Sequence, residues 1–322
     1  MKPQAKHCII CEKSNVDLLY PPLAIVKCQR CGLIYRDVLG IEEGYYFNLD
    51  KYRKTLEDPL KMASRQRDAI LRFDILEKII PFKGRLFDIG ANDGITMQEA
   101  QKRGFQVFGC EPNIFTAGYA QKNGLDVIND SFEKAFLQIK AKGPFDVITA
   151  FHVLEHFSNP LEILEMIKQL LVSSGWLIIE IPDIDSPISR IYKWEGLRIH
   201  KEHLFYFNKK TLITLLKKAG FEIIFLKSKV WDGLNRPFIE NLIRLPMISE
   251  IYMMLRQLKK YLKIILGIKP VRRTNLEDNV ELWIKEGDAQ EGSHFLHNSL
   301  GRLIYNLNRG DDLFIVAQSR RE

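Results

Sequence analysis

Long apolar runs and cysteines are both scarce in this sequence. No stretch approaches the roughly 20 apolar residues that a transmembrane helix needs, and no apolar segment follows the charged N-terminus Met1–His7 as a secretory signal would require. Five of the 322 residues are cysteine, too few for a disulfide-rich secreted scaffold. These absences predict a cytoplasmic protein.

A large excess of charge of one sign is also missing. There are 47 lysines and arginines against 40 acidic residues, and the formal net charge is +7. This charge permits contact with nucleic acid, anionic lipid or phosphorylated substrates but selects none of them. With 46% hydrophobic and 27% charged residues, the composition is that of a folded chain, with one large domain and an appendage, or two domains.

Four of the five cysteines form two CxxC pairs, Cys8 with Cys11 and Cys28 with Cys31. Two residues between thiolates let one tight turn point both sulfurs at a tetrahedral ion, so the two turns predict a four-thiolate zinc site. A thiol pair with redox activity is the alternative. Because such a site has no open coordination position, the zinc would be structural. The segment lacks an aromatic pattern typical of RNA binding, which argues against nucleic acid as a partner.

From residue 84 onward, short apolar runs alternate with segments of helical spacing. In one of them Leu161, Leu164 and Ile167 recur at helical spacing behind Pro160, which suits a first helical turn. This alternation predicts a doubly wound, mostly parallel α/β sheet, whose ligands bind beyond the carboxyl ends of the strands. The predicted strands are 85–89, 106–110, 126–128, 145–149, 176–181, 221–226 and 312–318, and the predicted helices are 96–103, 116–123, 160–172 and 209–219.

The first of these strands runs into a loop that begins at Gly90 and ends at Gly94. A dinucleotide fingerprint needs a further glycine where this chain has Asn92. The flanking Asp88 and Asp93 would repel a pyrophosphate, whereas they suit a ligand that carries an ammonium and a sulfonium. Gly90 and Gly94 let a ligand approach the backbone closely. The loop therefore predicts S-adenosylmethionine (SAM) as the cofactor.

Residues after the next strands extend the predicted cofactor site. A carboxylate at Glu111, which closes the second strand, can accept hydrogen bonds from both ribose hydroxyls. The remaining candidates are Pro112 beside it, Asp130 and Ser131 after the third strand, where adenine is expected, and Phe151 and His152 after the fourth.

With these motifs the chain resembles the class I SAM-dependent methyltransferases, and more narrowly the bacterial group with an N-terminal zinc knuckle, which includes sugar C-methyltransferases of deoxysugar pathways. The resemblance covers the CxxC pairs, the loop after Asp88, Glu111 with Pro112, and the stretches 153–156, 201–207 and 309–318. It implies a Rossmann-like sheet of seven strands. It also implies a zinc-binding knuckle (1–45), a helical linker (46–83), a SAM-binding core (84–230), a helical insertion or lid (231–310) and a last core strand (311–322).

Methyl transfer is an in-line displacement, so the enzyme mainly positions the nucleophile and excludes water. A nucleophile that starts protonated also needs a base, and histidine suits this role near neutral pH. His203, oriented by Glu202, is the preferred base, and packing under a lid is its alternative. His156 is a second candidate that would otherwise shape the cofactor pocket, and His152 is interpreted as a cofactor contact.

The long insertion contains one helical seam, in which Ile251, Leu255, Leu258, Leu262 and Ile265 follow each other at spacings of four and three. Basic residues lie mostly off the seam. The segment is interpreted as a lid or core-packed helix, a dimer seam, or a helix over 248–273 that lies on anionic lipid at the inner face of the membrane. The oligomeric state stays open.

These features predict a SAM-dependent methyltransferase for a small molecule, in particular a sugar nucleotide or a precursor of a glycan or surface polysaccharide, by O- or C-methylation. An RNA or protein methyltransferase is the second hypothesis. Methyltransferases that act on amino groups carry an Asn/Asp-Pro-Pro-aromatic motif after the fourth strand. This chain has Ala150-Phe151-His152 there, which argues against the second hypothesis. A SAM-binding scaffold without catalysis is the third.

Overall fold

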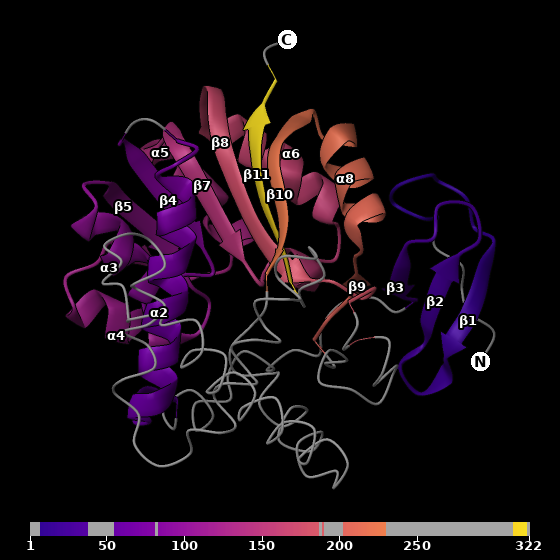
Figure 1. Ribbon diagram of the computed structural model, residues 1–322, viewed down its shortest axis with the longest axis horizontal. Coiled ribbons are helices and arrows are strands. Elements are labelled where there is room, and N and C mark those ends of the chain that lie inside the picture. Colours follow the sequence, from indigo (N-terminus) through magenta and orange to yellow (C-terminus); the bar gives the residue numbers. More distant parts are fainter. Residues whose placement is uncertain are drawn as a thin grey trace, which may run out of the picture. The chain divides into compact units, whose positions relative to one another are not determined.

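The computed structural model describes residues 7–37, 55–80, 83–186, 189, 202–229 and 312–320. Its centre is a seven-stranded sheet with the order β10-β11-β8-β7-β4-β5-β6 (Figure 1). The strands are β4 (Arg85–Ile89), β5 (Gln106–Cys110), β6 (Val127–Ile128), β7 (Phe145–Phe151), β8 (Leu171–Pro182), β10 (Phe221–Lys229) and β11 (Asp312–Ser319). Strands β4 to β8 run parallel, and β11 is antiparallel between β8 and β10.

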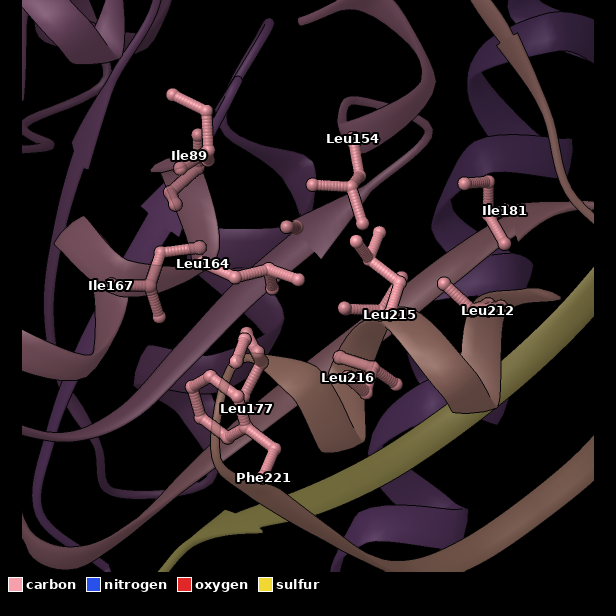
Figure 2. Close-up of a cluster of buried hydrophobic side chains, with 14 of the residues drawn as sticks. Ile89, Leu154, Leu164, Ile167, Leu177, Ile181, Leu212, Leu215, Leu216 and Phe221 are labelled. Atoms are coloured by element: carbon pink, nitrogen blue, oxygen red, sulfur yellow. The ribbon is translucent and has the colours of Figure 1, made fainter. Parts of the chain in front are cut away.

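Helices cover both faces of this sheet because successive residues of each buried strand point to opposite sides. On one face, Leu86 of β4 packs with Phe73 of α2 (Pro59–Leu76) and with residues of α3 (Ile95–Lys102) and α4 (Ile114–Lys122). On the other face, Phe87 packs in a cluster with α5 (Phe132–Lys142), α6 (Pro160–Leu170) and α8 (Lys209–Lys218). Figure 2 shows the second cluster, where Leu164 and Leu215 from two helices meet Leu177 of β8.

Side-chain caps start several of these helices, because the first backbone N–H groups of a helix have no partner inside it. Asn113 accepts hydrogen bonds at the start of α4, Ser131 at α5 and Asn159 at α6, where Pro160 occupies the first turn. Asn208 and Thr211 form a reciprocal capping box at α8.

The N-terminal cysteine region forms a second sheet with the order β1-β2-β3-β9. It contains β1 (Val16–Tyr20), β2 (Ile25–Cys28), β3 (Ile34–Arg36) and β9 (Phe205–Tyr206). Because β9 comes from the chain just before α8, the knuckle sheet is completed by a strand from the core. Ile34 pairs with Tyr206 and Tyr35 with Phe205, all antiparallel.

The predicted fold class is confirmed, and every predicted core strand is present. The predicted helix 160–172 ends earlier, at Leu170, because β8 begins at the next residue and takes over the same apolar run. Helix α5 was not predicted, although Phe132, Ala135 and Ile139 are its buried positions at spacings of three and four. Strand β9 has only two residues, which is too short for a periodic pattern.

The chain divides into two compact units, residues 1–229 with 310–322, and residues 230–309. The predicted insertion 231–310, including the proposed membrane-surface segment 248–273, lies outside the described residues. Among the described residues, no helix is both long and apolar enough to cross a membrane.

Candidate functional site

The predicted cofactor loop lies at the carboxyl end of β4, and Asp88 lies inside it. This side chain is 3% exposed, and its Oδ1 accepts a hydrogen bond of 2.6 Å from the hydroxyl of Thr149 on β7. Burial raises the pKa of Asp88 to about 7, against the lowering effects of the Thr149 hydroxyl and of Arg72. The carboxylate therefore changes charge near neutral pH, and a cationic ligand would favour its ionised form.

The two loop glycines are required by the protein itself. Gly90 has φ 72° and Gly94 has φ 82°, both in the left-handed region. A Cβ atom on Gly94 would lie 2.2 Å from Cδ1 of Leu125, and one on Gly90 would lie 2.7 Å from Cγ2 of Val153. The Cβ positions are thus filled by protein side chains, so the fold itself requires glycine at both places. The close approach of a ligand to these glycines stays a prediction. Asn92 shares the left-handed backbone, with φ 52°.

Glu111 joins the loop to the end of β5. Its Oε2 accepts from the backbone N–H of Asn92 and its Oε1 from that of Asn113, each at 2.9 Å. Burial raises the pKa of Glu111, although these backbone hydrogen bonds lower it. The side chain of Thr116 also donates to this carboxylate. A carboxylate has about four lone-pair sites, so acceptor capacity remains at the position predicted for ribose.

Asp93 was expected to face a cationic ligand, but it is buried and paired with an arginine of the protein. The side chain is 1% exposed, and Nη2 of Arg65 on α2 lies 3.0 Å from its Oδ1, which also accepts from the N–H of Ile95. Its negative charge is therefore compensated from within the protein rather than presented to a cationic ligand.

The remaining cofactor candidates follow β5, β6 and β7. Pro112 is partly exposed beside Glu111. Asp130 accepts from the N–H of Ser131, whose hydroxyl caps α5 through Lys134 at 3.4 Å. Phe151 stacks on Phe314 with ring centroids 6.3 Å apart.

A buried ionic network below Phe151 was missed by the sequence reasoning. Nε and Nη2 of Arg72 on α2 donate to the two carboxylate oxygens of Glu180 on β8 at 2.8 and 2.9 Å. The same guanidinium lies 4.4 Å from the centroid of Phe151. Nε2 of His152 lies 3.3 Å from Oε1 of Glu180. Burial opposes a charged imidazolium, but Asp312 and Glu180 outweigh it and raise the pKa of His152. No motif marks these residues, because they come from an amphipathic helix and an apolar strand.

The catalytic candidates meet on the side of the knuckle. The rings of His156 and His203 are 4.9 Å apart in an edge-to-face arrangement, although the sequence presented them as alternatives. Nδ1 of His156 is 3.0 Å from the backbone carbonyl of Glu202, and the N–H of Leu204 donates to the carbonyl of Glu155 at 2.9 Å. Glu202 thus contacts the neighbouring histidine through its backbone, and its side chain is 9% exposed.

Glu155 was also missed, and it precedes His156 directly. It lies in the short helix η3 (Leu154–His156), and within the described part of the chain neither of its buried carboxylate oxygens has a hydrogen-bond partner. Burial raises the pKa of Glu155, although His156 and His152 lower it.

The four knuckle cysteines converge as predicted. Sγ of Cys8 lies 3.4 Å from Sγ of Cys31, and Sγ of Cys11 lies 3.4 Å from that of Cys28, and all four sulfurs are within 4.8 Å of one another. Tetrahedral zinc with bonds of about 2.3 Å separates its sulfurs by about 3.8 Å. The residues therefore fit a closed four-thiolate site.

Residues 60–226, about half of the 322 residues, match the family model described as a methyltransferase domain, and the chain belongs to this family. The solved structure of a SAM-dependent methyltransferase from Thermotoga maritima, a possible histamine N-methyltransferase, is similar with a TM-score of 0.50. At 18% identity over 86% of this chain and 100% of that one, it shows a shared fold. The protein is thus a member of the class I SAM-dependent methyltransferases.

Two curated relatives indicate the range of this family. A ubiquinone biosynthesis O-methyltransferase of Caulobacter sp. (strain K31) is 31% identical over 128 residues, which are 38% of this chain and 51% of the relative. The C-methyltransferase NovU of Streptomyces niveus is 26% identical over 208 residues, 63% of this chain and 47% of the relative. The chain spans about half the length of the curated relatives it matches.

Proposed function

We propose that this protein transfers a methyl group from SAM to an oxygen or carbon atom of a small molecule, in particular a sugar nucleotide or a glycan precursor. The observation that carries this proposal is the pair of buried carboxylates, Asp88 and Glu111, on either side of a left-handed loop at the carboxyl ends of β4 and β5. SAM has an ammonium group and a ribose diol to match them, and it has no phosphate for the loop to repel.

In this proposal the SAM site is made of the residues predicted for it. Asp88 faces the amino group and Glu111 the ribose, while the loop passes along the ligand. The set is Asp88, Gly90, Asn92, Gly94, Glu111, Pro112, Asp130, Ser131, Phe151 and His152.

Histidines on the knuckle side would face the acceptor. His203 precedes β9, and Nδ1 of His156 is held by the carbonyl of Glu202. An imidazole nitrogen there can accept the proton of an acceptor hydroxyl or of a carbon next to a keto group while the methyl leaves the sulfonium. The similarity to a C-methyltransferase over 63% of this chain supports a carbon acceptor, whereas the similarity to a ubiquinone biosynthesis O-methyltransferase supports an oxygen acceptor.

The proposed function also includes a structural zinc ion in the knuckle. Cys8, Cys11, Cys28 and Cys31 would hold it in a closed site, where its contribution is to fix the knuckle fold.

Isothermal titration tests the cofactor site. We expect SAM to bind the protein at one site and the Asp88→Ala variant to bind at least tenfold more weakly, because a hydrogen bond to a charged group contributes about 1.5–3 kcal/mol. Asp126→Ala is the matched control, since that carboxylate is exposed and pairs with Lys142. Equal affinity of all three proteins would contradict the site assignment.

Methyl transfer itself is tested by mass spectrometry. Protein and isotopically labelled SAM are incubated with nucleotide sugars, keto-sugars and catechols, and a labelled methyl group in one class identifies the acceptor. SAM binding without labelling of any acceptor, including those in a cell extract, would favour a binding scaffold. Labelling confined to the RNA of that extract would instead favour an RNA methyltransferase.

A further inference from the structure

Three side chains on the knuckle side of the core offer metal-ligating atoms to one point. Glu155 and His156 come from η3 after β7, and His203 comes from the segment that leads into β9. One ligand atom from each lies within 4.8 Å of the others. Glu155 is 1% exposed and His203 is 7% exposed, so this is a buried cluster and not a chance group of surface charges.

Glu155 is the first reason to look for a cation there. Both carboxylate oxygens are buried, and neither has a hydrogen-bond partner among the residues that the structure describes. Its nearest ion-pair contact in the described part of the chain is Nδ1 of His152 at 3.8 Å, which is too long for a hydrogen bond. Buried carboxylates are normally paired, hydrogen-bonded or bound to metal. Among the described residues, Glu155 has only the long contact with His152 and no hydrogen bond.

His156 supplies the second reason. Its Nδ1 lies 3.0 Å from the carbonyl oxygen of Glu202, and a carbonyl only accepts, so Nδ1 carries the proton. The lone pair is then on Nε2. Histidines that bind metals usually donate their other ring N–H to a carbonyl or carboxylate in this way, which fixes the tautomer and the ring orientation.

A neighbouring cluster provides a comparison within the same protein. His152, Glu180 and Asp312 also place three ligand atoms within 4.8 Å. There, however, Arg72 donates two hydrogen bonds to Glu180, so the cluster already contains its cation. In the part of the chain that the structure describes, no arginine or lysine forms an ion pair with Glu155. Among the described residues, both carboxylate oxygens of Glu155 are buried without a hydrogen bond, whereas in the other group this holds only for Oδ2 of Asp312.

We infer that Glu155, His156 and His203 bind one divalent cation of the transition series. One carboxylate and two imidazoles suit Zn²⁺, Mn²⁺, Fe²⁺ or Co²⁺, whereas Ca²⁺ and Mg²⁺ prefer oxygen ligands alone. Three protein ligands leave coordination positions open, as in catalytic metal sites. This site is separate from the four-thiolate cluster of the knuckle, and it differs from it in both ligand type and openness.

The position of the site suggests what the open positions hold. Val153, two residues before Glu155, lies against Gly90 of the cofactor loop, because a Cβ on that glycine would come within 2.7 Å of Cγ2 of Val153. The cation would thus lie on the same edge of the sheet as the cofactor. Resting on the proposed function, we infer that it binds a hydroxyl or keto oxygen of the acceptor and orients it toward the sulfonium methyl. With the cation bound, His156 and His203 are its ligands and not the base; the cation would lower the pKa of the acceptor's hydroxyl, or of the carbon beside its keto group, so that the proton passes to water.

Manganese titration followed by electron paramagnetic resonance tests the inference. The purified full-length protein with its zinc is titrated with Mn²⁺, which does not compete for thiolates, and the free-ion signal is recorded. We expect one bound Mn²⁺ per chain and at least a tenfold loss of affinity in Glu155→Gln. Glu165→Gln is the matched control, since this exposed residue of α6 undergoes the same change of charge. His203→Asn provides a second variant, with the same expected loss.

SAM titration of the same samples separates the possible failures. SAM binding without Mn²⁺ binding, or equal Mn²⁺ affinity of Glu155→Gln and Glu165→Gln, would overturn the cation site and leave the proposed function standing. Mn²⁺ binding that needs Glu155 and His203, without SAM binding, would support the cation site and contradict the proposed function. Retained SAM binding in Glu155→Gln shows that the variant is folded.

Discussion

The two sides of the proposed active site are built in different ways. The cofactor side, by which we mean Asp88, the loop 90–94 and Glu111, comes from one continuous β-α-β stretch of chain. The acceptor side, Glu155, His156 and His203 with β9, comes from two segments of the core, and the knuckle strand β3 pairs with it. On the cofactor side the described carboxylates accept hydrogen bonds from the loop, from Thr149 or from Arg65. On the acceptor side Glu155 accepts none.

This difference teaches how the two tasks are separated. In the proposed site, a local loop would supply the groups that bind the cofactor. The acceptor would be bound by groups brought together from distant parts of the chain. The acceptor side would therefore depend on the pairing of the knuckle strand β3 with β9. The hydrogen bonds given above for Asp88, Asp93 and Glu111 involve no residue of the knuckle.

Loss of the proposed zinc should have the largest effect, because it should disrupt the acceptor side and leave the cofactor side intact. Cys28→Ser leaves three thiolates, and we expect the knuckle to lose its metal and β3 to separate from β9. Structural zinc contributes on the order of 10 kcal/mol in small domains, so the effect should exceed that of any other single change. Mass spectrometry measures the zinc content. Hydrogen exchange measures how well the backbone amides of Phe205 and Tyr206 are protected. Cys110→Ala, which changes a buried thiol outside the cluster, should retain zinc. Zinc retained in Cys28→Ser would contradict the four-thiolate site.

Arg72→Met should have the next largest effect, because Arg72 and Glu180 lie between the two sides. The variant leaves a buried carboxylate without its bidentate partner, at a cost of about 3–5 kcal/mol in the free energy of unfolding. Denaturant unfolding measures this loss. Adding Glu180→Leu should recover much of it, since no buried charge is then left alone. Lys83→Met, which opens the exposed pair with Glu77, should cost under about 1 kcal/mol. Similar losses for Arg72→Met and Lys83→Met would show that the network is not buried in solution.

The pH dependence of SAM binding tests whether Asp88 on the cofactor side is the group that binds SAM in its ionised form. An ordinary aspartate titrates near 4, whereas the pKa of Asp88 in the folded protein is about 7. Between these values the folded state binds the extra proton, so its stability without ligand should fall as the pH rises from about 4 to about 7. SAM needs the ionised carboxylate. Its affinity should therefore rise about tenfold from about pH 6 to about pH 8, as the ionised fraction of Asp88 rises.

Titration calorimetry in two buffers of different ionisation enthalpy should detect the proton released on binding below this pKa. The Asp88→Asn variant should lose this part of the pH dependence and the proton release. Affinity of the native protein that does not change with pH would show that Asp88 is not the titrating group.

Ser131→Ala should have the smallest effect and separates two roles of one residue. Its hydroxyl caps α5, and loss of a cap costs about 1 kcal/mol. We expect this loss in denaturant unfolding and less than a twofold change in the dissociation constant of SAM, because the hydroxyl is already used by the N–H of Lys134. A large loss of SAM affinity without loss of stability would instead assign the hydroxyl to the ligand.

The sequence was most informative where the chemistry is local. The strand before Asp88, the loop glycines, Glu111 and the two CxxC pairs each lie within a short stretch, and their spacing alone predicts what they approach. The SAM-contact set remains a prediction, although the loop and Glu111 do come together.

Sequence reasoning failed where contacts join distant segments. Glu180 sits in an apolar strand and Arg72 in a polar helix, and neither has a periodic or spacing signal that relates it to the other. Glu155 was passed over in favour of its histidine neighbour, because a carboxylate without a hydrogen bond cannot be recognised before its surroundings are known. Strand β9 was missed because two residues carry no periodicity, yet it is the strand by which the segment before α8 pairs with the knuckle sheet.

The pairing of β3 with β9 has a consequence for how such proteins are exchanged and recombined. Ile34 and Tyr35 provide the ladder for the segment just after His203, so a transplanted acceptor segment would arrive with an unpaired edge unless its knuckle came with it. If the segment around His203 binds the acceptor as proposed, we expect acceptor preference to be transferred together with the N-terminal cysteine module. A chimaera that takes both from this chain should fold around a foreign cofactor domain more readily than one that takes either alone.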